Sequence, residues 1–284
     1  MYRARREKFR EYMAGDKCLI PASIFDAFSI RLAEDIGFEV GMVGGSSASL
    51  AVLGAPDLIV MTLTEFADQC RRMSRASELP FAVDADHGYG NALNVRRAVE
   101  ELEAAGVSAL SIEDTVLPLH HGQAGMELLS VEEGAGKMRA ALDARQDAST
   151  VIVGRTSAAG VNGMEDAIAR GRAYADAGVD ALFFLGVESV EDYQRLGDTF
   201  ELPIVTGGGL KIADAYTLGR CGVRLCLNGH PVLPAAVRAM EEALVAMREL
   251  RAPDRPASKE LMQRATRADD YEQWIDEYLG GANG

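Results

Sequence analysis

The sequence has little that would bind nucleic acid or enter a membrane. Its 284 residues carry 43 acidic against 29 basic side chains, and the formal net charge is −14. A surface of this sign repels phosphate backbones, so we expect no nucleic-acid partner. No apolar run approaches the roughly 18 residues that a membrane span needs, so we expect no membrane insertion either.

Cysteine is also scarce. The four cysteines include no CxxC pair and are too few for a disulfide framework, so we expect buried, reduced thiols in a cytoplasmic protein. The N-terminal residues MYRARREKFREYM lack the apolar stretch of a secretory signal. Glu7 and Glu11 argue against an organelle transit peptide, which is usually poor in acidic residues.

Short apolar segments alternate with helical patterns along most of the chain. Near-continuous apolarity indicates strands buried on both faces, which is typical of a parallel sheet. Such segments lie at 18–22, 40–45, 80–86, 108–114, 150–156, 180–186, 202–208 and 223–229. Eight strands with helices between them predict an α/β fold, the (β/α)8 TIM barrel. An open doubly wound sheet is the alternative, but no GxGxxG follows the first strand.

The chain beyond the last strand predicts additional helices. A long helical pattern follows strand eight, and RAPDRPAS then indicates a linker. The tail carries an apolar stripe at helical spacing, made of Tyr271, Trp274, Ile275, Tyr278 and Leu279. We therefore predict a catalytic barrel domain over residues 1–252 and a C-terminal helical extension over 253–284. The extension packs either on its own barrel or on a neighbouring subunit.

Carboxylates gather where two neighbouring strands end, which is the end of such barrels that carries active sites. Asp84 and Asp86, in VDADHGYGN, are two residues apart, so both face one side of a regular strand. Two carboxylates at a barrel mouth repel each other and need a proton or a cation. Oxygen-only ligation suits Mg²⁺ or Mn²⁺. An acidic turn is the alternative. Glu113 and Asp114 end the next strand, and one of them is expected to face the mouth.

Other strand ends carry further candidates for substrate binding. Arg155 fits a substrate carboxylate or clamps a nearby Asp or Glu. The segment with Ser46 and Ser47 offers hydroxyls and amides for a carboxylate or keto oxygen, or is a turn without a ligand. His230 is either structural or a hydrogen-bond donor to the substrate. Gly207–Gly209 form a phosphate cradle or a tight turn.

The segment TVLPLHHGQAGMELLS after strand four is long for a loop between a strand and a helix. Long loops at this face often act as lids over the active site. Its adjacent histidines, His120 and His121, form no obvious zinc pattern.

Three segments in order, VDADHGYGN, LEAAGVSALSIEDTVLP and GRTSA, resemble the phosphoenolpyruvate mutase/isocitrate lyase superfamily. The resemblance covers most of the chain, through strand eight and the tail helices. It implies a (β/α)8 barrel whose terminal helix is exchanged between the subunits of a homo-oligomer, usually a tetramer.

The same resemblance implies roles for individual residues. Asp84 would coordinate Mg²⁺ directly, while Asp57, Asp86 and Glu113 would act mainly through bound waters. The substrate carboxylate and oxygens would be held by Ser46, Arg155 and the backbone amides of the segment from Gly45 to Ser47.

The long loop narrows the activity that the resemblance implies. Lyase members carry KKCGH there, with a catalytic cysteine, and phosphonate mutases carry an FPKTN-like motif; TVLPLHHGQAG has neither. Together with NGHP, this loop is most similar to the oxaloacetate decarboxylase branch. We therefore expect magnesium-dependent decarboxylation of oxaloacetate, a small 2-keto diacid, to pyruvate and carbon dioxide. The reaction would pass through a metal-stabilised enolate, and His230 would contact the substrate. A carbon–carbon lyase of the isocitrate or 2-methylisocitrate type and a phosphonate or phosphoenolpyruvate mutase are the alternatives.

Overall fold

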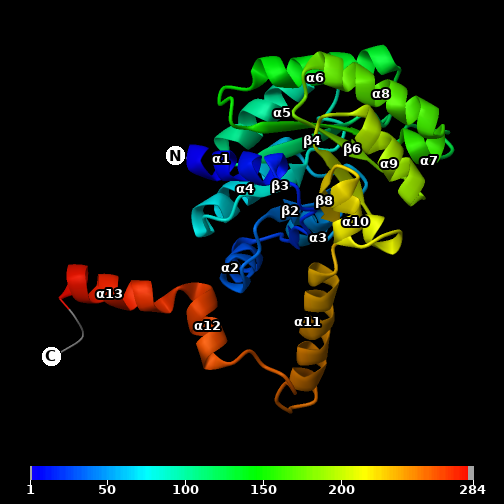
Figure 1. Cartoon of the computed structure of the whole chain (residues 1–284). Helices are drawn as coiled ribbons and strands as arrows, with labels where there is room; N and C mark the ends of the chain where they lie inside the picture. Colours follow the sequence, from blue (N-terminus) through cyan, green and yellow to red (C-terminus); the bar gives the residue numbers. More distant parts are fainter. Residues whose placement is uncertain (1, 281–284) are drawn as a thin grey trace. The chain divides into compact units, whose positions relative to one another are not determined.

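A computed structural model describes residues 2–280, and its eight strands form one parallel sheet in chain order (Figure 1). The strands are β1 (Ala22–Ser23), β2 (Gly41–Val43), β3 (Phe81–Asp84), β4 (Ala109–Glu113), β5 (Val151–Thr156), β6 (Ala181–Phe184), β7 (Ile204–Gly207) and β8 (Val223–Leu227). Leu19 makes a parallel bridge to Leu225 of β8, which joins the two ends of the sheet. The predicted (β/α)8 barrel is confirmed.

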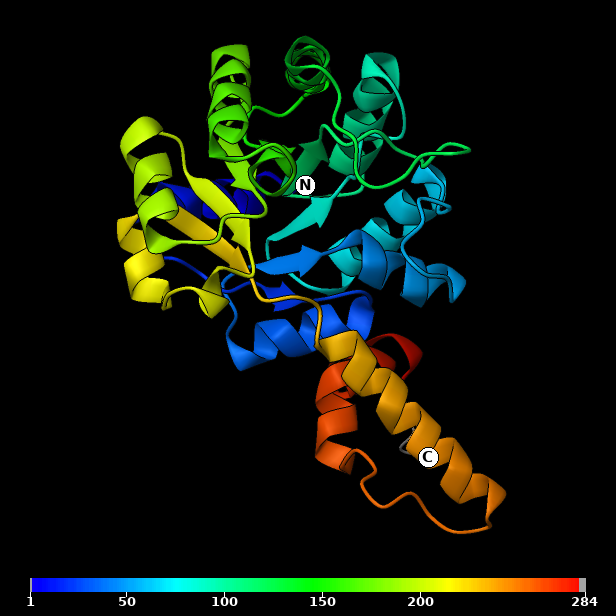
Figure 2. The same cartoon turned by 90° about the vertical axis from the view of Figure 1, so that its right-hand side faces the viewer.

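Helices surround the strands of the barrel (Figure 2). They are α1 (Arg3–Ala14), α2 (Ala27–Ile36), α3 (Gly45–Leu53), α4 (Leu63–Ala76), α5 (Ala92–Ala104), α6 (Val131–Ala144), α7 (Ala158–Val161), α8 (Met164–Ala177), α9 (Val190–Thr199), the 3₁₀ helix η1 (Gly209–Lys211) and α10 (Ala215–Arg220). Local sequence starts several of them; Thr62 and Glu65, for example, form a capping box at α4. None of the described helices is long and apolar enough to cross a membrane.

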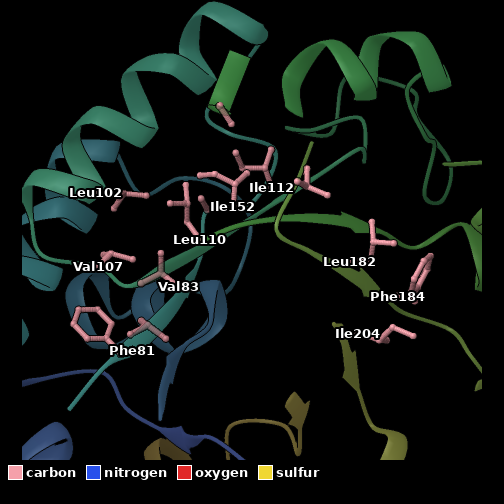
Figure 3. Close-up of a cluster of buried hydrophobic side chains, with 14 of the residues drawn as sticks. Phe81, Val83, Leu102, Val107, Leu110, Ile112, Ile152, Leu182, Phe184 and Ile204 are labelled. Carbon is pink, nitrogen blue, oxygen red and sulfur yellow. The ribbon is translucent and has the colours of Figure 1, made fainter. Parts of the chain in front are cut away.

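Successive side chains of each strand point to opposite faces of the sheet, and this divides the core into two layers. Phe81, Val83 and Leu110 point toward the helices and pack in the outer layer (Figure 3). Ala82 and the other residues of opposite parity belong to a separate inner cluster that fills the barrel. Phe9 and Met13 of α1 join that inner cluster, so α1 closes one end of the barrel.

The first strand begins later than the sequence predicts. We expected a strand over 18–22, and β1 covers only Ala22–Ser23. The Leu19 amide donates to the Arg224 carbonyl, whereas the Ala22 amide donates to the Val40 carbonyl. The chain therefore changes partner from β8 to β2 around Pro21, whose nitrogen has no hydrogen to donate.

The structure divides into two compact units, Met1–Pro231 and Val232–Gly284. The second unit contains α11 (Val232–Arg248), α12 (Lys259–Thr266) and α13 (Ala268–Leu279). The division falls before α11, whereas the predicted catalytic domain ends after it, at residue 252. That α11 belongs to the catalytic domain stays a prediction.

The apolar stripe of the tail lies on α13 and is exposed. Its five side chains are between 44% and 77% accessible in the single chain. Tyr271 and Trp274 contact each other edge to face, with ring centroids 5.1 Å apart. Exchange of this helix between subunits stays a prediction.

Candidate active site

Strand alternation brings three charged side chains into the mouth of the barrel. Asp84 has the same parity in β3 as Ala82 of the inner cluster. Glu113 and Arg155 likewise follow the inner residues of β4 and β5, and the strand register pairs them directly. All three stand at or near the carboxyl ends of their strands, where barrel enzymes hold their reactive groups.

Arg155 joins the carboxylates of two neighbouring strands. Its Nη1 pairs with Asp84, and its Nη2 lies 3.1 Å from Glu113 Oε2. The guanidinium also stands 5.2 Å from the centroid of the Phe183 ring. The sequence left open whether this arginine clamps protein carboxylates or binds substrate; in this structure it clamps two carboxylates.

Asp57 and Asp86 both lie close to the backbone of Gly45. A Cβ added to Gly45 would lie 2.9 Å from Asp86 Oδ1 and 3.2 Å from Asp57 Oδ1. Only a residue without a side chain lets both carboxylates come this close to the start of α3. Asp86 itself adopts a left-handed backbone conformation, with φ at 48°.

The four carboxylates share one neighbourhood and repel one another. Burial raises the pKa of Asp86 to about 9, and Asp84, Asp57 and Glu113 add to that rise. Burial also raises the pKa of Glu113 to about 7, although Arg155 opposes the shift. The pKa of Asp57 is raised by partial burial and by Asp84. One guanidinium therefore does not balance the negative charge gathered here.

The first turn of helix α3, beside these carboxylates, has backbone amides that no side chain caps. Its N-cap is Gly44, so no side chain caps the first turn, which runs from Gly45 through Ser46 and Ser47. The Ser47 hydroxyl donates to the Gly44 carbonyl at 2.9 Å, whereas Ser46 is exposed. Uncapped amides at a helix N-terminus favour an anion.

His230 stands next to this helix start. Its Nδ1 lies 3.1 Å from the Ser23 hydroxyl, and a Cβ on Gly44 would overlap its Nε2. Burial lowers the pKa of His230, and Asp84 and Asp57 partly oppose that shift. Ser23 was not among the residues that the sequence singled out, because no motif marks a serine in a two-residue strand.

A second group lies behind Glu113, and of its residues the sequence singled out only Asp114. Asp114 has the opposite parity and points away from the mouth, toward α8. Its Oδ2 accepts hydrogen bonds from Arg170 Nη1 at 2.9 Å and from Tyr174 Oη at 2.5 Å. Arg170 Nη1 also donates to the Leu129 carbonyl at 2.8 Å, which anchors the far end of the long loop. Arg170 and Tyr174 are four residues apart on one helix face, a spacing that offers a sequence signal.

Two other sequence candidates are not part of this cluster. A Cβ on Gly209 would stand 3.0 Å from Thr206 Cγ2 and 3.1 Å from Tyr193 Oη, so the glycine makes room for core side chains. His120 and His121 are exposed in the long loop.

The residues at the mouth fit a hard divalent cation. The donors are carboxylate oxygens in excess over the one arginine, which is the ligand chemistry of Mg²⁺ or Mn²⁺. Within residues 2–280, no three Asp, Glu, His or Cys side chains converge closely enough to bind one ion together. Magnesium commonly keeps several waters and takes only one or two carboxylates directly, so it does not require three converging side chains.

Known proteins match the chain over almost its whole length. The family model for phosphoenolpyruvate phosphomutase matches residues 9–248. The oxaloacetate decarboxylase of Rhodopseudomonas palustris strain BisA53 is 52% identical over 283 residues and covers 98% of each chain. Among solved structures, oxaloacetate acetylhydrolase in complex with the inhibitor 3,3-difluorooxalacetate has a TM-score of 0.87 at 24% identity, over 99% of each chain.

A further solved structure is that of phosphonopyruvate hydrolase in complex with oxalate and Mg²⁺. It has a TM-score of 0.84 at 24% identity and covers 97% of this chain and 99% of the other. At such identities the two structures establish the shared fold, while the family model and the 52% relative establish the family. The chain belongs to the phosphoenolpyruvate phosphomutase family.

Proposed function

We propose that this protein decarboxylates oxaloacetate to pyruvate and carbon dioxide with the help of a divalent cation. The observation that carries the proposal is the 52% identity, over 98% of each chain, to a relative named oxaloacetate decarboxylase. That match spans the barrel mouth, the long loop and His230. The site geometry supports the same chemistry, because it combines a cation-binding face with a helix start suited to a carboxylate.

Asp84 is proposed as the direct ligand of the metal, with Asp57, Asp86 and Glu113 holding its water ligands. When bound, the metal supplies a Lewis acid for the electron pair that is left when carbon dioxide departs from C4. Mg²⁺ is the preferred ion because the donors are all oxygens, and it accompanies oxalate in the related phosphonopyruvate hydrolase complex. Mn²⁺ has the same ligand preference.

The protein's own groups hold the substrate by its non-leaving end. The amides at Gly45 and Ser47, with Ser46 and Arg155, are proposed to hold the C1 carboxylate and neighbouring oxygens. His230 donates a hydrogen bond to a substrate oxygen and so orients the ligand. Cleavage itself needs no general base, so the protein's contribution is orientation and stabilisation of the charge that develops.

The exposed stripe on α13 supports a further part of the proposal, a homotetramer in which this helix packs on a neighbouring subunit. Light scattering after size exclusion should give four times the mass of one chain. Removal of residues 268–284 should lower that mass. We also propose a cytoplasmic location, which agrees with four buried free thiols.

A panel of 2-keto and 2-hydroxy diacids tests the reaction. With added Mg²⁺, oxaloacetate should give pyruvate by proton NMR, faster than in the presence of a chelator. Glyoxylate or succinate from a hydroxy acid would instead indicate a carbon–carbon lyase. A phosphorus-containing product from phosphoenolpyruvate or a phosphonate would indicate a mutase.

Substitution His230→Ala tests the substrate contact. The variant should keep the circular dichroism of the wild type and lose at least about tenfold in kcat/KM, equivalent to about 1.4 kcal/mol. Unchanged kcat and KM would remove His230 from the proposed site.

A further inference from the structure

The imidazole of His230 is held across the closure of the barrel. His230 follows β8, the last strand, while Ser23 ends β1, the first strand. These residues are 207 positions apart, and Ser23 Oγ lies 3.1 Å from His230 Nδ1. Ser23 is buried, with 9% of its surface accessible, so the contact is sheltered from competing water.

Gly44 fixes the opposite edge of the ring. A Cβ there would overlap Nε2, and it would stand 2.6 Å from Cε1 and 2.9 Å from Cδ2. The Nε2 edge therefore packs on the bare backbone at the start of α3. Ser23 and Gly44 together determine where each ring nitrogen points, but the ring position alone leaves open which nitrogen carries the proton.

The partners of the two ring nitrogens distinguish the two tautomers. Burial favours a neutral imidazole, which has one N–H and one acceptor nitrogen. Nε2 lies on the side of Gly44, at the start of α3, where the proposed function places the substrate oxygens. Those oxygens accept hydrogen bonds, so the N–H is needed on that side. The serine hydroxyl is able to donate as well as accept, so it donates to Nδ1 when Nε2 holds the proton.

We propose that Ser23 is a positioning residue that holds His230 in the Nε2–H tautomer, so that the ring presents a donor to the substrate oxygen. This tautomer rests on the proposed function, because the substrate oxygen is the group that requires an N–H on Nε2. Without the Ser23 hydroxyl, Nδ1 has lost its donor and the two tautomers become closer in energy. In the Nδ1–H form, Nε2 would turn a lone pair toward an oxygen that also carries lone pairs.

Nitrogen-15 NMR of the histidine rings tests the tautomer without any turnover. The chain has only four histidines, and the signals lost in His230→Asn assign His230. The wild type should show the Nε2–H pattern, and Ser23→Ala should shift the Nδ1 and Nε2 resonances toward each other. Ser23→Thr, which keeps a hydroxyl, should restore the wild-type pattern. A wild-type ring protonated on Nδ1, or a Ser23→Ala spectrum identical to wild type, would overturn the proposal.

Ser74→Ala is the matched control for this experiment. Ser74 is also buried, at 2% accessible, and its hydroxyl has no hydrogen-bond partner among the described residues. The same substitution there should leave the His230 resonances in place. A shift as large as that of Ser23→Ala would attribute the change to loss of a buried hydroxyl in general and contradict a specific role.

A double-mutant cycle tests the consequence for catalysis. With oxaloacetate and Mg²⁺, Ser23→Ala should lower kcat/KM about tenfold, and the loss should disappear when His230 is already alanine. Equal losses in both backgrounds would contradict action through His230. If the wild type does not decarboxylate oxaloacetate, the proposed function fails, while the NMR result still decides the role of Ser23.

Discussion

Glu113 and Asp114 are consecutive buried carboxylates, and each contacts an arginine. Glu113 faces the barrel mouth, where it shares Arg155 with Asp84. Asp114 faces the helices, where Arg170 and Tyr174 both donate to the same oxygen. One step along a β-strand thus separates a carboxylate that accepts from an arginine and a tyrosine from one that shares a single arginine with a second carboxylate.

The two carboxylates differ in how well their surroundings balance their charge. Asp114 and Arg170 connect the end of β4 to α8 and to the end of the long loop. In the mouth, burial raises the pKa of Glu113 to about 7 and that of Asp86 to about 9, because the charged forms lack enough partners. Such an excess of buried negative charge costs stability unless a cation joins it, and it marks a functional site.

The largest expected effect on catalysis comes from the loss of Asp84. Asp84→Ala should lower oxaloacetate turnover at saturating Mg²⁺ by at least about 100-fold, equivalent to about 2.7 kcal/mol. Its free energy of unfolding should stay the same or increase, because one of four mutually repelling carboxylates is gone. Near-normal turnover in a steady-state assay would refute the metal assignment. Asp143→Ala, on the exposed surface of α6, is the control and should change neither quantity.

Removal of Asp114, in contrast, should lower the stability of the protein. Asp114→Ala leaves Arg170 buried without its main partner, so the free energy of unfolding should fall by about 3 kcal/mol. Chemical denaturation in urea measures this change, again with Asp143→Ala as the control. A loss below about 1 kcal/mol would mean that Asp166, the second partner of Arg170, suffices to hold it.

Added Mg²⁺ should stabilise the protein through the carboxylates of the barrel mouth. This stabilisation should not depend on the hydrogen bonds around Asp114. At 100 times its dissociation constant, Mg²⁺ should raise the free energy of unfolding of the wild type by about 2.7 kcal/mol, and a chelator should reverse the effect. Asp84→Ala should abolish the increase, whereas Tyr174→Phe should keep it. Thermal unfolding with and without Mg²⁺ gives the answer, and an increase that survives in Asp84→Ala would place the ion elsewhere.

The smallest expected change in stability comes from removing the hydroxyl of Tyr174. Tyr174→Phe removes a hydrogen bond to Asp114 but leaves Arg170 in place, so we expect a loss of about 1.5 kcal/mol in the free energy of unfolding. Turnover at saturating substrate should stay within about twofold of wild type. A much larger loss of turnover, with stability kept, would show that the outward cluster also controls the mouth.

Much of the fold follows from the sequence because buried parallel strands are apolar along their whole length. The same segments also predict where strands end, and so they single out Asp84, Glu113 and Arg155. The late start of β1 was missed because Pro21 and Leu19 lie in an apolar run, and only the pairing of Leu19 with β8 shows where the strand begins. Strand pairing depends on contacts between distant segments, and the apolarity of a single segment does not predict them.

The contacts within the site were harder to predict because they join distant segments. Nothing near Ser23 indicates His230, and nothing near Gly45 indicates Asp57 or Asp86. The sequence holds a partial signal for the Asp114 network, because Arg170 and Tyr174 lie on one face of α8. Gly134 and Gly154 also leave room for the Tyr174 ring, since a side chain at either position would lie against it. Such spacing predicts a shared face of a helix but does not identify what that face contacts.

Gly44 and Gly45 together restrict how this site can change. A side chain at position 44 would take the place of the imidazole, and one at position 45 would push two carboxylates apart. If the proposed site is right, selectivity for a different acid has to be altered at positions other than these two glycines. Residues 118–127 of the long loop are mostly exposed, so exchanges there leave the barrel interior intact. A library confined to that loop would sample new substrates on an unchanged chemical centre.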